Sequence, residues 1–238
     1  MTGHAVPSRS ATPARPSIAG AVFDAALTPA ERRLVARLKT PPAIQDFLEG
    51  LTYSPDEFYR CPLRVLRDGK AHCFDGALFA AAMLQRLGHR PLILDLLANR
   101  RDDEHMLALF RVGRCWGALA KSNTTGLRYR DPVYRSVREL AMSYFAQYFN
   151  VEREKTLRGY TGPLDLRAFD RQRWLTEDAT ADRISTRTEQ VRQIVLVDER
   201  TARALPLVDE RSFAAGLLGA NWDALYRPPT RSRTPKGR

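Results

Sequence analysis

The fold is decided by the stretch Gly69-Lys70-Ala71-His72-Cys73-Phe74-Asp75-Gly76-Ala77-Leu78-Phe79-Ala80. This stretch places a cysteine at the start of a long apolar helix. The segment after Cys73 has no proline, repeats apolar residues at helical spacing and stops at Gly88, a residue favoured just past a helix end. We therefore predict a helix of about four turns. Free backbone N–H groups and the helix dipole at its N-terminus favour an anion, and this setting converts a thiol into a thiolate. The alternative is that Cys73 is a small buried apolar residue.

A strand and a hairpin follow this helix. Residues 91–97 form a short apolar run that predicts a buried strand, and residues 106–112 and 115–120 flank Gly113-Arg114 like the arms of a hairpin. His105 opens the first arm. The order of a helix-start cysteine and a strand-start histidine is the order that a Cys-His nucleophilic site needs.

The hairpin predicts which residues lie opposite one another. If Val112 pairs with Cys115, the same register places His105 opposite Ser122, with Asn123 as the next residue along. A polar group that could orient the imidazole is therefore expected within its reach.

Three acidic residues precede the histidine: Asp102, Asp103 and Glu104. A carboxylate close to the ring favours imidazolium, which suits a thiolate–imidazolium pair. We therefore predict that the Cys73 sulfur lies within about 3 to 5 Å of a ring nitrogen of His105. The alternative is a solvated histidine at a strand end in an acidic loop.

At these residues the chain resembles the transglutaminase-like branch of the papain-type cysteine enzymes, over roughly residues 40 to 125, about a third of its length. The matching features are Gly69 and Cys73 before an alanine-rich helix, Leu87-Gly88 before the next strand, His105 at a strand start and Trp116 in the following strand. The resemblance implies attack by a cysteine thiolate on an amide or ester, with the histidine acting as base and then as acid. It also implies that the backbone N–H of Cys73 is an oxyanion donor and that a third polar residue orients the ring.

The third residue departs from the family pattern. The family usually places an orienting aspartate four residues after the tryptophan, where this chain has Ala120. The candidates are Asn123, Ser122 and Asp131. We favour Asn123, because a side-chain amide accepts from an imidazole N–H without fully charging the site. An asparagine that ends a strand in a turn is the alternative.

Metal and cofactor motifs are missing from the sequence. His72, His89, His105 and Cys115 suggest zinc by type, but no Cys-x-x-Cys pair and no His-x-x-x-His spacing occurs. The sequence also has no P-loop and no dinucleotide glycine fingerprint. We predict no metal and no cofactor.

The other cysteines and the start of the chain bear on the compartment. Cys61 and Cys115 are expected to pack in the structure, which leaves an odd number of thiols, and no secretory signal precedes them. These features predict a cytoplasmic protein. No apolar run approaches the roughly 20 residues of a membrane span, so no membrane partner is expected.

The net charge of +11 is concentrated at the ends of the chain. Residues 1–20 hold two arginines and residues 227–238 hold five basic residues, neither with an acid, so these segments carry 7 of the 11 charges. Both are rich in Pro, Ser, Thr and Arg and are predicted to be disordered tails. Nucleic-acid binding is expected to be weak and confined to the tails, since no base-recognition motif is present.

Further helices are predicted from their start signals. These are Thr28-Pro29-Ala30-Glu31, Thr40-Pro41, Ser54-Pro55-Asp56-Glu57 and Ser136-Val137-Arg138-Glu139, the last opening an aromatic stripe over residues 140–149. In the C-terminal third, helices are expected over residues 165–174, 180–195 and 210–218.

We therefore predict an α+β fold with a transglutaminase-like/papain-like core, a helix-rich N-terminal part, a small mainly antiparallel sheet and a helical C-terminal extension. The predicted parts are a tail at 1–20, a core at 21–150, the extension at 151–226 and a tail at 227–238.

The predicted function is a cysteine hydrolase or acyltransferase that acts on an amide bond of a protein or peptide-like substrate. Cys73, His105 and Asn123 are the predicted catalytic residues, and the reaction passes through an acyl-enzyme. The alternative is an inactive scaffold of the same fold that serves as a protein-interaction module. Ala120 favours this alternative, whereas the presence of Cys73 and His105 opposes it.

Overall fold

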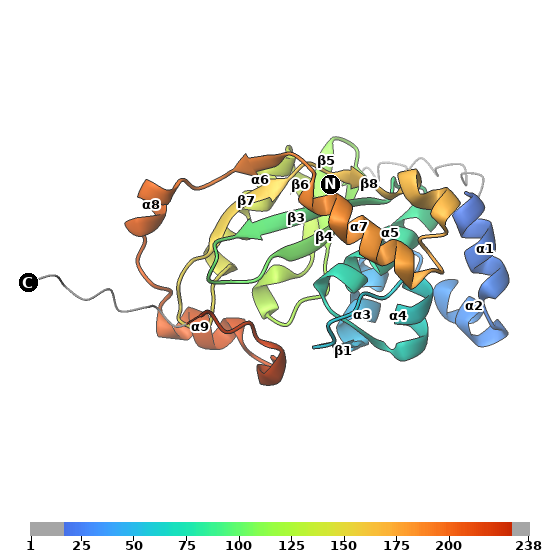
Figure 1. The fold of residues 1–238 in the computed structure, drawn as a ribbon, viewed down its shortest axis with the longest axis horizontal. Coiled ribbons are helices and arrows are strands. Elements are labelled where there is room, and N and C mark those ends of the chain that lie inside the picture. Colours follow the sequence, from blue (N-terminus) through green and yellow to red (C-terminus); the bar gives the residue numbers. More distant parts are fainter. Residues whose placement is uncertain (1–16, 230–238) are drawn as a thin grey trace, which may run out of the picture.

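The computed structural model describes residues 17–229 and has the predicted α+β architecture (Figure 1). Its centre is a seven-stranded sheet in which neighbours pair in the order β6-β5-β4-β3-β7-β9, with β8 also paired to β3, every pair antiparallel. The strands are β3 (Leu92–Ala98), β4 (His105–Val112), β5 (Cys115–Leu119), β6 (Arg130–Tyr134), β7 (Leu157–Thr161), β8 (Leu164–Asp165) and β9 (Gln193–Val195). A separate parallel pair joins β1 (Thr52–Tyr53) to β2 (Lys70–Ala71).

The helices gather at the two ends of this sheet in Figure 1. On the right lie α1 (Ile18–Ala26), α2 (Pro29–Val35), α3 (Pro41–Gly50), α4 (Pro62–Asp68), α5 (Cys73–Arg86) and α7 (Asp178–Glu189). On the left lie α8 (Glu199–Arg203) and α9 (Glu210–Gly216), and α6 (Val137–Met142) packs on β5 and β6.

Helix α5 forms as the sequence predicts. It begins at Cys73, where the His72 ring accepts a hydrogen bond from the Phe74 N–H, and it ends before Gly88, whose φ of 90° is a conformation that glycine adopts without strain. Its central residues are buried against β4 and β3, and its alanines allow close packing.

Strand β4 separates two hydrophobic cores. Met106, Ala108 and Phe110 belong to the core that contains α5, whereas Leu107 and Leu109 belong to a second core that contains Tyr144 and Tyr148. Successive side chains of a strand point to opposite faces, so His105 shares the face of Leu107.

The predicted hairpin register is confirmed. Val112 pairs with Cys115, and the ladder continues to Ala108 opposite Leu119. It stops there, so the expected pairing of His105 with Ser122 is not part of the ladder.

Several predicted elements differ from those observed. The capping box of Thr28 and Glu31 opens α2 as expected, but residues 54–57 form no helix, because the Ser54 hydroxyl accepts from the Asp56 N–H in a tight turn. The next helix begins only at Pro62. The aromatic stripe after Ser136 forms a short α6 and a separate 3-10 turn over Phe145–Gln147 rather than one helix.

The C-terminal third is less helical than predicted. It contributes β7, β8 and β9, of which β7 pairs with the central strand β3. Residues 166–172 are a 3-10 helix, and residues 193–195 form a strand. The segment predicted as an extension therefore completes the sheet.

At the N-terminus, the Ser17 hydroxyl caps α1, which begins at Ile18, inside the segment predicted as a tail. Most of the two predicted tails, residues 1–16 and 230–238, lies outside the described residues.

Candidate functional site

Cys73 lies where the sequence analysis places it, at the first turn of α5, and it borders a cleft of about 800 Å³. The residue is partly buried, and its thiol donates a long hydrogen bond of 3.9 Å to the carbonyl oxygen of Glu104. The backbone N–H of Met106 also faces the sulfur. The phenol of Tyr53 lies against the backbone of Cys73, at the group that the family resemblance predicts as an oxyanion donor.

The His105 side chain has a hydrogen-bond partner other than this thiol. The side chain is 5 % exposed on the opposite face of β4, where Nε2 lies 2.7 Å from the carbonyl oxygen of Leu127. A carbonyl oxygen only accepts, so Nε2 carries a proton and donates it there. The hydrogen bonds of the two residues go to different partners, and Met106 rather than His105 packs in the core that contains α5, so the close contact of Cys73 and His105 stays a prediction.

The predicted orienting residue has a different contact. The amide of Asn123 makes two hydrogen bonds to the backbone of Asn221, each 2.8 Å long. Ser122 bonds to Thr124 instead, and Asp131 lies beside Tyr129 on β6. The hydrogen-bond partner of His105 Nε2 is instead a backbone carbonyl, that of Leu127, which residue type does not reveal.

The electrostatics of the site oppose a thiolate–imidazolium pair. Burial raises the pKa of the Cys73 thiol to about 12, and the nearby carboxyls of Asp103, Asp95 and Asp75 act in the same direction. Burial lowers the pKa of His105 to about 4, and burial together with the charge of Arg60 lowers that of His72 to about 4. At neutral pH the thiol is protonated and both rings are neutral.

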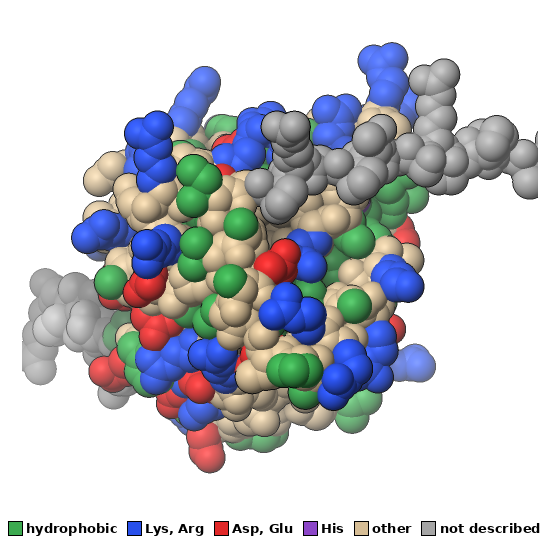
Figure 2. Space-filling model, turned by 90° about the vertical axis from the view of Figure 1, so that its right-hand side faces the viewer, with side chains coloured by type: hydrophobic (Ala, Val, Ile, Leu, Met, Phe, Trp, Pro, Cys, Tyr) green, Lys and Arg blue, Asp and Glu red, His purple; other side chains and the backbone are tan. Residues whose placement is uncertain are grey.

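Acidic residues dominate the lining of the cleft. Eight carboxyl groups and a single guanidinium, that of Arg100, come from the described residues that line it. The carboxyls include Asp95 on β3, Asp103 and Glu104 before β4, and Asp223 near the C-terminus. This cleft is a local exception in a chain of net charge +11, whose Lys and Arg side chains are spread over the face seen in Figure 2.

Asp95 is the most deeply buried carboxyl in this lining. It is 6 % exposed, stands opposite Met106 in the sheet and therefore points to the face of Cys73. Its backbone N–H donates to Thr161, and its side chain shares a hydrogen bond with Glu104. Burial and the Glu104 carboxyl raise the pKa of Asp95 well above its usual range. Its Oδ1 has no hydrogen-bond partner among the described residues.

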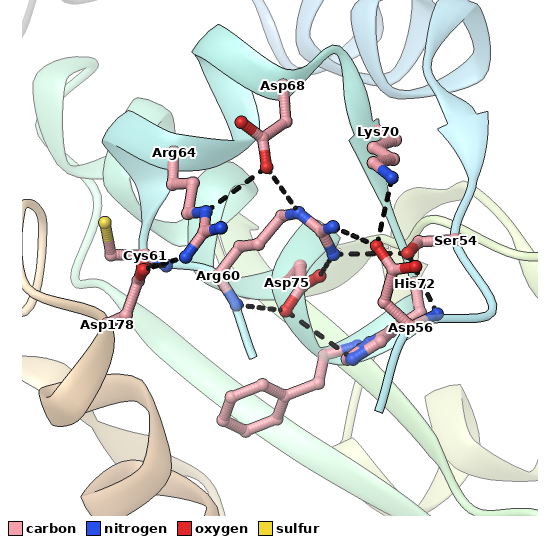
Figure 3. A network of polar contacts seen from close by, with 11 residues as sticks. Ser54, Asp56, Arg60, Cys61, Arg64, Asp68, Lys70, His72, Asp75 and Asp178 are labelled. Carbon is pink, nitrogen blue, oxygen red and sulfur yellow. Dashed lines mark hydrogen bonds and ion pairs between the residues drawn. The ribbon is translucent and has the colours of Figure 1, made fainter. Parts of the chain in front are cut away.

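A buried ionic network supports the wall of the cleft (Figure 3). The Arg60 side chain is fully buried and contacts Asp56, Asp68, Asp75 and Ser54. Asp75, in the first turn of α5, accepts a bond of 2.8 Å from the Arg60 N–H and also lies 3.6 Å from the His72 ring. The network thereby fixes the start of α5.

Three residues of the site are not predicted by the sequence: Tyr53, Arg60 and Asp95. The one available signal was for Asp95, since a carboxyl inside the apolar run Leu92-Ile93-Leu94-Asp95-Leu96-Leu97 needs a reason to be buried. Tyr53 and Arg60 are distant in sequence from Cys73, and only the tertiary structure brings them to it.

Residues 17–229 lack both a cluster of metal-ligating side chains and a membrane-spanning helix. These residues contain no group of three His, Cys, Asp or Glu side chains arranged to hold a metal ion. They also contain no helix that is both long and apolar enough to cross a membrane. Cys61, Cys73 and Cys115 are all free thiols. Cys61 is buried at the start of α4, where its backbone N–H donates to Asp178. The cytoplasmic location stays a prediction.

No family model matches the sequence, and no curated protein matches it. Among solved structures, the chain is similar to LapG of Legionella pneumophila in three forms. All three are 17 % identical to it.

The similarity to LapG is partial. One LapG structure matches with a TM-score of 0.33, over 44 % of this chain and 68 % of LapG. The EGTA-treated form has a TM-score of 0.33 over 47 % and 72 %, and the calcium-bound form 0.32 over 44 % and 72 %. TM-scores this low carry no argument about activity, so membership of the transglutaminase-like superfamily stays a prediction.

Proposed function

We propose that this protein is an interaction module that binds a ligand in the acidic cleft beside Cys73 and does not use Cys73 as a nucleophile. The observation that carries the proposal is the position of the His105 ring, which lies on the far face of β4 and donates to Leu127. Cysteine acyl transfer needs a base within hydrogen-bond reach of the thiol. The thiol contacts backbone groups instead.

The cleft supports a binding role. Its volume of about 800 Å³ is in the range of sites that hold a ligand, and it is lined by aromatic rings as well as carboxyls. It is bordered by parts of the chain far apart in sequence, from Tyr53 to Tyr226, which the fold brings together.

A second candidate is the cysteine hydrolase or acyltransferase predicted from the sequence. One observation favours it: Cys73 sits in the first turn of α5 at the edge of an open cleft, where a helix N-terminus stabilises an anion. This function would require His105 or another base to move to the sulfur.

The two candidates differ in whether Cys73 forms an acyl-enzyme. The test is to mix the protein with p-nitrophenyl acetate between pH 6 and pH 8 and to measure the burst of nitrophenol and the mass of the protein, with Cys73→Ser as control. We expect no burst that depends on Cys73. A nitrophenol burst equal in amount to the protein, and absent from both Cys73→Ser and His105→Gln, would overturn the interaction module and support the enzyme.

A further inference from the structure

The interactions within residues 17–229 do not explain why the Asp95 side chain is buried in the cleft. A buried oxygen without a hydrogen-bond partner destabilises the folded protein. The Asp95 Oδ1 nevertheless lacks a partner among the described residues, and the residue lines the cleft. A carboxyl oxygen in this position is ready to accept a hydrogen bond from a ligand.

The groups around Asp95 indicate the charge of that ligand. Glu104 shares a hydrogen bond with Asp95, and Asp103 is close enough to disfavour its ionisation. Neighbouring carboxyls of this kind repel one another when both are ionised, so a cation placed between them offsets the repulsion and favours their ionised forms. Arg100 supplies the one guanidinium among the described residues that line the cleft, so acidic side chains far outnumber basic ones there.

The aromatic lining indicates the shape of the ligand. Tyr53, Tyr59, Phe74 and Tyr226 border the same cleft. A guanidinium is planar, stacks on aromatic faces and offers several N–H donors to carboxylates, whereas an ammonium is a compact, strongly hydrated point charge.

We propose that the Asp95–Glu104 pair is a recognition site for the guanidinium group of an arginine side chain in a peptide bound along the cleft. This proposal rests on the proposed function, since it names the ligand class of the same cleft. The N–H groups of the guanidinium donate to the free oxygen of Asp95 and to Glu104. The Tyr59 and Phe74 rings, whose centroids lie 4.6 Å apart, form an aromatic wall of the cleft that contacts the arginine stem.

The test uses the full chain and two matched peptides, N-acetyl-Ala-Ala-Arg-Ala-Ala-amide and the same peptide with citrulline in place of arginine. Citrulline keeps the shape of the side chain and removes its charge. Isothermal titration calorimetry at low and high salt is expected to show binding of the arginine peptide that is about tenfold or more tighter than that of the citrulline peptide and that weakens with salt.

Variants locate the binding. Asp95→Asn and Glu104→Gln should each weaken the arginine peptide by about tenfold, since each removes a charge-assisted hydrogen bond. Glu104 is exposed, so Glu104→Gln is expected to fold even if Asp95→Asn is destabilised. Asp131→Asn, an exposed change on β6 outside the cleft lining, is the matched control and should leave the affinity unchanged.

The outcomes separate this proposal from the proposed function. Equal affinity for both peptides, with protection of Cys73 from alkylation by each, overturns the arginine site and keeps the interaction module. Binding unaffected by Asp95→Asn and Glu104→Gln, or no binding of either peptide, also overturns the arginine site. An acyl-enzyme on Cys73 overturns the interaction module instead.

Discussion

Replacing Arg60 by methionine tests whether the buried network holds the start of α5. Arg60 is fully buried, with its Nε 2.9 Å from Asp68 and one terminal nitrogen 3.4 Å from Asp75, and it also contacts Asp56. Asp75 is itself fully buried, so the change leaves it as an uncompensated carboxyl. Breaking one side of a buried ion pair costs about 3–5 kcal/mol. For a chain of this size that lowers the unfolding temperature by about 6–20 °C.

The pH dependence of this loss gives a sharper check. Burial raises the pKa of Asp75 to about 6 in the folded protein, above its ordinary value. A raised carboxyl pKa means that the folded state binds this proton more tightly, so the contribution of Asp75 to stability falls as pH rises towards and through 6. Without Arg60 the charged form becomes costlier still. Arg60→Met should therefore lose more stability at pH 7 than at pH 5.

Urea unfolding followed by circular dichroism at the two pH values measures both effects. Arg64→Met is the matched control, because Arg64 is 43 % exposed while it pairs with Asp68 and Asp178, and exposed pairs contribute about 0–1 kcal/mol. The double variant Arg60→Met/Asp75→Asn should recover part of the loss. A loss for Arg60→Met no larger than that for Arg64→Met, or one independent of pH, would refute the reasoning.

Two further substitutions test the packing around the cleft. Gly76→Ala should destabilise the protein by about 1–3 kcal/mol, because its Cβ would lie 2.4 Å from the Cβ of Lys121, whereas Gly50→Ala, with open space around it, should not destabilise it in the same thermal melts. A Gly76→Ala melt equal to wild type would contradict that close approach. Tyr148→Phe should cost about 0.5–1.5 kcal/mol in urea unfolding, because the Asp103 carbonyl loses its bond of 2.7 Å from the buried phenol, and an unchanged midpoint would show that this bond contributes nothing.

The backbone of the site could be predicted from the sequence, because its signals are local. The Cys73 helix has an apolar pattern and Gly88 as its stop, and the hairpin has Gly113, whose φ of 58° suits its tight turn. These features depend on neighbouring residues, and the structure has both elements with the expected register.

The direction of the His105 side chain could not be predicted in the same way. The first six residues of β4 are all buried, so its sequence shows no alternation of apolar and polar residues that would identify the face towards α5. A shift of one position decides whether His105 or Met106 faces Cys73. Packing of α5 settles this choice in favour of Met106, and it also brings Asp95 to the cysteine.

The C-terminal strands were missed for a related reason. Residues 157–161, Leu-Arg-Gly-Tyr-Thr, mix charge and apolar character, yet they pair with the central strand β3. Their pairing partner lies about sixty residues earlier, so no local sequence pattern predicts the pairing.

The ionisation of Cys73 tests the central claim most directly. Ultraviolet absorbance of the thiolate, followed against pH in the folded Cys61→Ala/Cys115→Ala protein, reports on this single sulfur. We expect no thiolate at pH 6 to 8, since burial and the neighbouring carboxyls raise the pKa of Cys73 to about 12, and we expect the same curve for His105→Gln. A thiolate already present at pH 6 and abolished by His105→Gln would contradict this expectation and restore the Cys-His enzyme.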